Sequence, residues 1–438
     1  MQSSRYGMPS KEVQRSDQVS DISAQADESD LSANNLVYSN PDSLSLAVSR
    51  STSRLFFQRA SYNPGETAVI DINSGTDFAD PANAYLTFSC VPTQATAAGT
   101  CTFGIGSAMN LIRQITIRSR SGVEIDRVER ANVWSLFESQ YKYPSSWFTT
   151  VGSATEGWGV TMANVAAATV NDTTNAGTRF CIPLARISSF FNGIKKGQKI
   201  PPQLLSGLHI EIIWETAATA LFSVGNTTTS YSIRNLSLMM DVISMTDDVQ
   251  KTINQQSANA GLEYAYPRIF TNPTTISSTV LNVQVRKAVS QANYSWAVSL
   301  NAANYNNIAV DSFLGIYDVL TYQWRLGALY YPLQPLSVNL LDGVEAYKQV
   351  LEVFGKSRDA WYPPNVLLAD YVTNGKGILG VVMEKDQAMD CSGLPVNNSR
   401  VLELQATYGT AVSNREVLVF LDYNSVCRSY VDNTSVSI

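Results

Sequence analysis

The sequence contains a single histidine, His209, which lies two residues before a carboxylate. Residues 208–214 alternate apolar and polar side chains as a β-strand does, so His209 and Glu211 should share one face. Such a histidine could act as a general base, or it could simply lie on the solvent or interface side of a sheet. A zinc site with two histidines is excluded, and a Ser-His-Asp triad would have to use His209.

Carboxylates on predicted strands are a second possible source of chemistry, namely Glu124, Asp126, Glu211 and Glu215. Two facing carboxylates could hydrolyse a glycosidic bond. Acidic side chains also alternate outward in any sheet that has one wet face. We therefore predict that the protein is not an enzyme and has no catalytic residues.

Cofactor and metal chemistry have little support in the sequence. The segment 104–106 (GIG) is not followed by a Lys-Ser/Thr pair and leads to a strand, so it is not a phosphate loop. No two cysteines have C-x-x-C spacing, and we predict free thiols in a reducing compartment. The cysteines are Cys90, Cys101, Cys181, Cys391 and Cys427. We predict no cofactor and no metal ligand.

Basic residues concentrate in one predicted hairpin: Arg113, Arg118, Arg120, Arg127 and Arg130. Glu124, Asp126 and Glu129 lie in the same hairpin and should pair with them. Contact with packaged nucleic acid is the alternative. A second basic group, Lys195, Lys196 and Lys199, is predicted to be a solvated turn. Aromatic residues and prolines gather at 324–336 and 361–364, where they favour either a core or a subunit contact.

The elements that would position these residues are mostly strands. In the first half, strands are predicted at 55–57, 67–72, 85–90, 111–117, 123–128, 179–182, 208–214 and 231–243. One helix is expected at 133–143, capped by Asn132 and ended by Pro144. Residues 152–177 are predicted to form a long exposed loop. This pattern indicates a β-sandwich or jelly roll.

The second half has the same character. Strands are predicted at 280–285, 295–298, 322–326, 378–383, 401–404 and 417–421. A helix at 343–355 should bury Val344, Tyr347, Val350, Leu351 and Phe354 on one side. The polar segment 246–260 is either a linker or a short helix. Each half thus holds strands with one helix midway, which hints at a duplicated fold.

The length and the charge of the chain are consistent with a protein made of more than one β domain. The 438 residues suggest two or three domains. The net charge of -6 argues against wrapping nucleic acid through overall charge, and Asn, Ser and Thr supply polarity in place of charged residues, which are only 16%. Neither a signal peptide nor an apolar run long enough for a membrane span is visible, so we predict a soluble chain of intracellular origin.

The N-terminal residues 1–53 read as a flexible arm in which acidic residues outnumber basic ones. An arm that binds a genome should be basic, so this arm should contact protein neighbours or have no partner. The predicted domains are the arm at 1–53, a first β domain at 54–247, a linker at 248–262 and a second β domain at 263–438.

Several segments carry a family resemblance. The segment 324–336 (WRLGALYYPLQPL), followed by the helix with Tyr347, resembles double jelly-roll major capsid proteins of polinton-like viruses, virophages and related eukaryotic double-stranded DNA viruses. Segments 391–399, 401–404, 417–423 and 430–436 are also similar. In the first half, 85–88 and 113–134 fit the same family in order and character.

The resemblance implies an all-β fold of two consecutive jelly-roll β-sandwich domains with short helices in the inter-strand loops. It implies a major capsid protein that trimerises into pseudo-hexagonal capsomers of an icosahedral shell, assembled inside the infected host cell. The implied partners are two further copies of the chain, neighbouring capsomers, minor capsid or penton proteins and, through the arm, an internal membrane. Sequence-specific nucleic-acid binding is not expected. The alternatives are a single jelly-roll capsid protein with a second β domain, and a carbohydrate-binding viral fibre or lectin-like β-sandwich.

Overall fold

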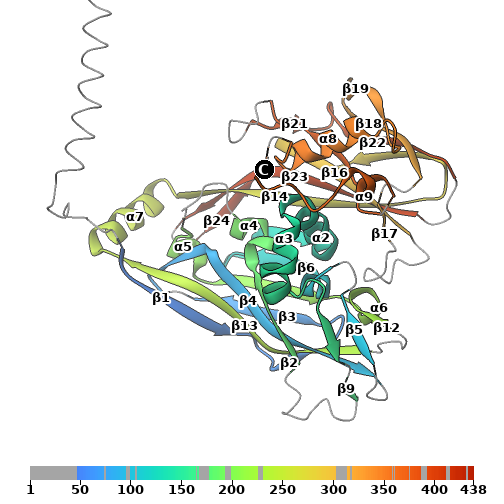
Figure 1. Cartoon of the computed structure of the whole chain (residues 1–438). Helices are drawn as coiled ribbons and strands as arrows, with labels where there is room; N and C mark the ends of the chain where they lie inside the picture. The colour runs from blue at the N-terminus through green and yellow to red at the C-terminus, as the bar shows by residue number, and fades with distance from the viewer. Residues whose placement is uncertain are drawn as a thin grey trace, which may run out of the picture. The chain divides into compact units, whose positions relative to one another are not determined.

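The computed structural model describes residues 47–438, apart from residues 74, 95–98, 104–105, 164, 167–176, 193–198, 225–229, 302–312, 316–317, 358, 360, 374, 386–391, 411–414 and 431–432. Antiparallel strands dominate the described residues (Figure 1). The strands up to Met245 pair with one another, and those from Leu262 onward do the same. The chain is therefore built from two separate sandwiches, which we call the first and second roll.

In the first roll, a sheet with the order β1-β13-β4-β10 packs against a sheet with the order β3-β11-β6-β7. The main strands are β1 (Ala47–Phe56), β3 (Thr67–Ile72), β4 (Phe78–Gln94), β6 (Ile112–Arg118), β7 (Glu124–Glu129), β10 (Thr178–Pro183), β11 (Leu208–Trp214) and β13 (Ser230–Met245). The short strands are β2 (Ser61–Tyr62), β5 (Thr100–Thr102), β8 (Thr161–Ala163), β9 (Val165–Ala166) and β12 (Phe222–Val224). The chain passes repeatedly between the two sheets, as in a jelly roll.

The second roll repeats this order. One sheet has the order β14-β23-β16, with β20 also paired to β16, and the other has the order β15-β22-β18-β19. The strands are β14 (Leu262–Ile276), β15 (Val280–Val285), β16 (Val289–Asn301), β17 (Phe313–Gly315), β18 (Val319–Leu326), β19 (Leu329–Ser337), β20 (Leu379–Val382), β21 (Leu394–Val396), β22 (Leu402–Tyr408), β23 (Arg415–Ser429) and β24 (Thr434–Ser437). Strand β14 thus corresponds to β1, β19 to β7 and β23 to β13.

The helices occupy equivalent connections. Helix α2 (Ala131–Lys142) follows β7, and α8 (Val344–Val353) follows β19. The other helices are α3 (Ser145–Thr149), α4 (Ser189–Asn192), α5 (Pro202–Leu205), α6 (Ala217–Ala220), α7 (Asp247–Asn259) and α9 (Leu368–Thr373), with single turns η1 (Ala108–Leu111), η2 (Gly152–Glu156) and η4 (Leu184–Arg186). The predicted fold of two consecutive jelly rolls is confirmed. The alternative with one jelly roll and a different β domain is wrong, because the strand order repeats.

Alternating side chains explain why the strands form where they were predicted. In β11 every second residue is buried, and the same holds in β15. The hairpin of β6 and β7 turns at Gly122, whose φ of 82° is favourable for glycine. Phe88 of β4 meets Trp214 of β11 edge to face at 5.4 Å, which joins the two sheets of the first roll.

Several local predictions were wrong. Residues 152–163 of the supposed exposed loop are partly buried: Glu156 is buried and binds both Arg186 (3.3 Å) and the Trp158 ring nitrogen (3.1 Å). Asn132 does not cap α2 but lies inside it and donates to Glu215 at 3.0 Å. Val344 was expected to be buried in α8 and is exposed. Of the two predictions for residues 246–260, a linker or a short helix, the helix is confirmed, because α7 spans Asp247–Asn259.

Strand β1 begins at Ala47, so residues 47–53 of the predicted arm belong to a sheet, paired with β13. Residues 1–46 lie outside the described residues. Within the described part of the chain, none of the helices has both the length and the apolar character needed to cross a membrane.

Candidate functional site

The structure brings His209 together with two carboxylates. Its Nδ1 lies 2.6 Å from Asp71 Oδ1 on β3, and its Nε2 lies 3.2 Å from Glu211 Oε1. Arg118 on the other neighbouring strand binds Glu211 at 2.8 Å. Both ring nitrogens therefore already have partners in a cross-strand polar cluster. This arrangement matches the structural interpretation of His209 and leaves no free nitrogen for a substrate.

The other acidic candidates are separated and have structural partners. Asp126 is buried and accepts hydrogen bonds from the Ser188 hydroxyl (2.7 Å) and the Phe190 amide (3.1 Å). Burial raises the pKa of Asp126. Glu124 pairs with Arg268 of the second roll at 3.1 Å.

The basic hairpin is only partly paired as predicted. Arg127 pairs with Glu129, as expected. The predicted pairing with Glu124 and Asp126 is wrong, because those acids face the second roll and α4 instead. Arg130 lies between Glu215 (3.9 Å) and Glu416 of the second roll (3.8 Å). Arg113 and Arg120 are exposed.

The lysines, cysteines and glycine segment singled out in the sequence lie partly within and partly outside the described residues. Lys199 is not a solvated side chain, because it binds Asp80 at 2.7 Å. Cys90, Cys101, Cys181 and Cys427 form no disulfide among the described residues. Among the described residues no cluster of His, Cys, Asp or Glu could hold a metal ion. Gly104, Lys195, Lys196 and Cys391 lie outside the described residues.

The contact between the two rolls was not predicted from the sequence. Strand β7 ends its sheet, so one side of its backbone has no strand partner. The Tyr266 hydroxyl of β14 donates to the Ile125 carbonyl of β7 at 2.6 Å. The Thr271 hydroxyl donates to the Glu129 carbonyl at 2.8 Å. Strand β14 of the second roll thus covers the open edge of the first.

Helix α2 extends this inter-roll contact over the outer face of the sheet that holds β14, β16 and β23. Trp296 of β16 is fully buried, stacks on Phe420 of β23 at 4.4 Å and meets Phe137 of α2 at 5.9 Å. Tyr141 of α2 stacks on Phe354, just after α8, at 5.3 Å. In Figure 1, α2 lies between the two rolls. The inter-roll contact therefore consists of a sheet edge plus a helix on one side, and a sheet face on the other.

The second roll has the same edge and helix, but they are uncovered. Strand β19 ends its sheet as β7 does, and α8 follows it. The segment after α8 is tied to it by a hydrogen bond from the Tyr347 hydroxyl to the Val366 carbonyl, 2.6 Å long. We call this the β19–α8 surface. Its exposed apolar side chains are Leu329, Tyr330, Leu333, Leu340, Leu341, Val344, Trp361, Tyr362 and Leu367.

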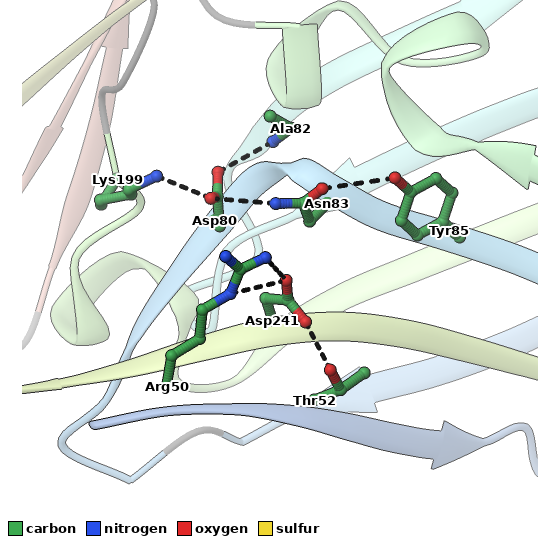
Figure 2. A network of polar contacts seen from close by, with 8 residues as sticks. All are labelled: Arg50, Thr52, Asp80, Ala82, Asn83, Tyr85, Lys199 and Asp241. Carbon is green, nitrogen blue, oxygen red and sulfur yellow. Dashed lines mark hydrogen bonds and ion pairs between the residues drawn. The ribbon is translucent and has the colours of Figure 1, made fainter.

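The first roll has the matching sheet face, which is exposed along β1, whereas its side chains on β13 and β4, among them Asp241, Ser237 and Thr87, are buried. Strand β1 is mostly exposed, whereas most residues of its counterpart β14 are buried or partly buried. On the outer side of this sheet Arg50 pairs with Asp241 of β13, and the Thr52 hydroxyl donates to Asp241 at 2.6 Å (Figure 2). These two contacts hold the pKa of Asp241 below its usual range. We call this outer side of β1, β13 and β4 the β1 face.

The β1 face is polar where its counterpart in the second roll is aromatic. Figure 2 shows a second group, in which Asp80 binds Lys199 and Asn83. Arg54 binds Ser237 at 3.1 Å, and Ser237 contacts Thr87 of β4 at 2.8 Å. The exposed side chains of this face lie on β1, among them Arg50 and Arg54, and such polar side chains can stay in water, whereas the Trp296 face is covered within the chain.

Comparison with known proteins adds to this geometry. No family model and no curated protein matches the sequence. Solved structures do match. PBCV-1 VP54, fitted into a reconstruction of the virophage Sputnik, has a TM-score of 0.57 and 12% identity, covering 89% of this chain and 97% of that chain. The Faustovirus major capsid protein has a TM-score of 0.53 and 9% identity, covering 90% and 92%. The mavirus major capsid protein has a TM-score of 0.51 and 10% identity, covering 92% and 94%. The chain has the double jelly-roll fold of these capsid proteins.

Inside this double jelly roll, the carboxyl group of Asp422 lies buried at the inter-roll contact. Asp422 of β23 accepts a hydrogen bond from the Asn293 side chain at 2.7 Å, and it lies near Tyr294, Lys142 and Glu138. Burial raises its pKa from 3.8 to about 7, although the Asn293 hydrogen bond and the Lys142 charge partly oppose the rise. The folded state therefore favours the neutral form of Asp422 more than the unfolded chain does.

We expect Asp422→Asn to change how the stability of the double jelly roll depends on pH. Between pH 4 and pH 7 the folded state binds more protons at Asp422 than the unfolded state, so this residue destabilises the fold progressively as pH rises. Asn cannot ionise. The free energy of unfolding of the variant, relative to that of the wild type, should therefore rise by roughly 2–4 kcal/mol across that range and then stay constant. Urea unfolding at several pH values measures the difference. Parallel profiles for the two proteins would contradict the expectation.

Proposed function

We propose that the chain is a major capsid protein that forms homotrimers with a pseudo-hexagonal outline. These capsomers would tile an icosahedral shell around a double-stranded DNA genome, which places the chain in the virion. The solved proteins with this fold support a capsid role. One observation carries the proposal. The inter-roll contact joins an edge strand and helix of the first roll to a sheet of the second, and the equivalent elements, β19 with α8 in the second roll and β1 in the first, are exposed.

The internal contact serves as a template for the contact between copies. Within the chain, β7 and α2 of the first roll cover the sheet face of β14, β16 and β23. The β19–α8 surface is the equivalent edge and helix of the second roll, and the β1 face is the equivalent sheet face of the first. If one copy's β19–α8 surface docks on the next copy's β1 face, each copy uses both surfaces once. Such a head-to-tail contact closes into a ring, and three chains provide six rolls.

The chemistry of the two surfaces suits a contact made after folding. Leu333 and Trp361 are 79% and 88% exposed, and they could pack against Phe56 and the aliphatic stems of Arg50 and Arg54. Trp361 could also stack on an arginine. Since the β1 face is polar, a single copy can remain in solution before it meets its partners.

The other assignments follow from the same proposal. The protein works through surfaces and catalyses no reaction. Neighbouring capsomers and minor capsid or penton proteins are its further partners, and the part of the arm that precedes β1, residues 1–46, contacts such neighbours or an internal membrane. The first roll spans residues 47–245 and the second begins at Leu262, and α7 lies between them, in place of the predicted bounds 54–247, 248–262 and 263–438. Recognition of a nucleic-acid sequence has no part in this function.

A carbohydrate-binding role is the second candidate, because Trp361 and Tyr362 are adjacent and exposed. Asp359 fixes them by accepting hydrogen bonds from both backbone amides, at 3.2 and 2.9 Å. Exposed aromatic rings of this kind can stack on sugars.

Native mass spectrometry and negative-stain imaging of the purified chain distinguish the two roles. The capsid proposal predicts a mass three times that of the 47.9 kDa chain and particles with a hexagonal outline. A stable monomer that binds a glycan array, with no trimer at micromolar concentration, would contradict it.

A further inference from the structure

Strand β24 forms a hairpin with β23 and pairs with no other strand in the described part of the chain. At the turn of this hairpin the Tyr430 amide donates to the Asn433 carbonyl at 2.8 Å. Bonded and non-bonded pairs alternate in an antiparallel ladder, so Ser435 is bonded to β23, whereas Thr434 and Val436 are not. The backbone N–H and C=O of Val436 therefore point away from β23, toward the open edge of the sheet.

This open edge has backbone groups that no described residue satisfies. The Thr434 amide is an exception, because it donates to Asn433 Oδ1 at 2.8 Å. The Thr434 carbonyl and both backbone groups of Val436 have no backbone partner among the described residues. An edge strand such as β10 carries Arg179 and Pro183, which hinder pairing with a further strand. Strand β24 (TSVS) has neither a proline nor a charge, so its own sequence does not block another strand.

The side chains of β24 alternate between a covered and an exposed face. Thr434 is buried and Val436 packs against the core, whereas Ser435 and Ser437 are exposed. Ile438 follows on the side of Val436 and is 42% exposed. A second β24 in antiparallel orientation would place Val436 opposite Val436 and Thr434 opposite Ile438. The row is thus complementary to itself, no like charges meet, and Ile438 becomes covered.

The edge of β24 belongs to neither of the surfaces that form the proposed ring. Asn433 and Thr434 line a cavity together with Pro202 of α5 and Gln250 of α7. In Figure 1, β24 lies toward the side of the molecule that holds α5 and α7, away from β19. A partner on β24 therefore leaves the β19–α8 surface free for the next copy in the ring.

We propose that β24 pairs antiparallel with β24 of a second copy of the chain, and that this copy belongs to a neighbouring trimer. A two-fold axis passes between the two Val436 residues, and each Val436 amide donates to the other Val436 carbonyl. Each Ile438 amide donates to the Thr434 carbonyl of the other copy, so none of these bonds needs the Thr434 amide. A ring of three chains contains no two-fold contact, so the pair joins two rings. The assignment to a neighbouring trimer rests on the proposed function, whereas the pairing of the two edges does not.

Disulfide trapping between two variants tests this register. In the proposed pair, Ser435 of one copy lies opposite Ser437 of the other as a non-bonded pair, with Cα atoms about 4.5 Å apart, within the range that a disulfide spans. Two copies of the same residue lie on a diagonal of about 7–8 Å, which is too far. A mixture of Ser435→Cys and Ser437→Cys chains, oxidised under native conditions, should therefore give roughly tenfold more linked dimer than either variant alone. Tandem mass spectrometry of the linked peptides separates these disulfides from any through native cysteines.

Two substitutions at Val436 provide the matched comparison, each added to both cysteine variants. Val436→Pro removes the central donor between the copies, yet the lost N–H is not one that binds β23, so the hairpin remains. It should reduce the yield of the 435–437 disulfide roughly tenfold. Val436→Ala keeps the amide and should retain most of the yield. Circular dichroism and thermal unfolding establish that both variants are folded.

Native mass spectrometry of the same samples separates this inference from the proposed function. Trimers that form without any 435–437 disulfide would overturn the pairing of β24 and leave the proposed function standing. A 435–437 disulfide between chains that form no trimers would support the edge pairing and contradict the proposed function. Equal yields for Val436→Pro and Val436→Ala, or links from position 435 to a segment other than β24, would also overturn the pairing.

Discussion

Leu333→Glu should convert the proposed trimer to monomers. Leu333 lies on β19 and is 79% exposed in the single chain, so a glutamate there leaves the fold intact. In the proposed ring the same position faces the β1 face of the next copy, and burying an unpaired carboxylate costs several kcal/mol. We expect the concentration needed for trimers to rise at least tenfold. Sedimentation velocity across a dilution series measures it.

Phe56→Glu on β1 should have the same effect from the other side of the contact, because Phe56 is 69% exposed in the single chain. Mixing the two variants tests the head-to-tail arrangement. The Phe56→Glu chain keeps an intact β19–α8 surface, and the Leu333→Glu chain keeps an intact β1 face. These two surfaces can dock once in a mixed pair, so heterodimers should form without closed trimers. Val280→Glu is the matched control. Val280 is 62% exposed on β15, at the other edge of the sheet that ends in β19, and its variant should remain trimeric.

Two outcomes would contradict this arrangement. If both variants remain trimeric, the contact lies elsewhere on the chain. If the mixture gives no heterodimer although each variant alone is monomeric, the two surfaces do not dock on one another.

Trp296→Ala should be the most destabilising single substitution at the inter-roll contact. The ring is fully buried, stacks on Phe420 and contacts Phe137 and Phe354, so one side chain joins β23, α2 and the end of α8. Its indole nitrogen has no hydrogen-bond partner, so the loss comes from packing alone. Removing a buried tryptophan typically costs about 3–5 kcal/mol. Guanidinium chloride unfolding should show a loss of this size.

Trp361→Ala is the matched control for that experiment, because it removes the same ring from a site that is 88% exposed. On the single chain it should change the free energy of unfolding by less than about 0.5 kcal/mol. Comparable losses for the two variants would contradict the assignment of Trp296 to the inter-roll contact.

The sequence predicts those strands whose side chains alternate strictly, such as β3, β11 and β15, because one buried face imposes a period of two. It misses β14 and β19, which contain Pro267 and Pro332. Proline removes a backbone donor, so it argues against an inner strand and is tolerated on an edge. Both of these strands lie at sheet edges, and β14 carries the contact between the rolls.

The residues of the inter-roll contact could not be predicted, because their partners lie far away in the sequence. Arg127 finds a partner on its own strand, as local spacing suggests. Glu124 pairs with a residue of the second roll, which lies far along the chain and whose position depends on how the rolls pack. The exposed aromatic segment at 361–364 was visible in sequence, but the structure was needed to place it beside α8. The equivalence of β7 with β19 becomes visible only when the strand order is known.

Photo-crosslinking from position 341 tests the central claim most directly. Leu341 is 89% exposed and lies just before α8, so a benzoylphenylalanine there should reach the next copy in the trimer. Trimers assembled from a mixture of ¹⁴N- and ¹⁵N-labelled chains distinguish links between copies from links within one. We predict intermolecular links to β1 and to the outer side of β13. Links from position 341 to the β19–α8 surface of another copy, or trimers without intermolecular links to the β1 face, would contradict the account.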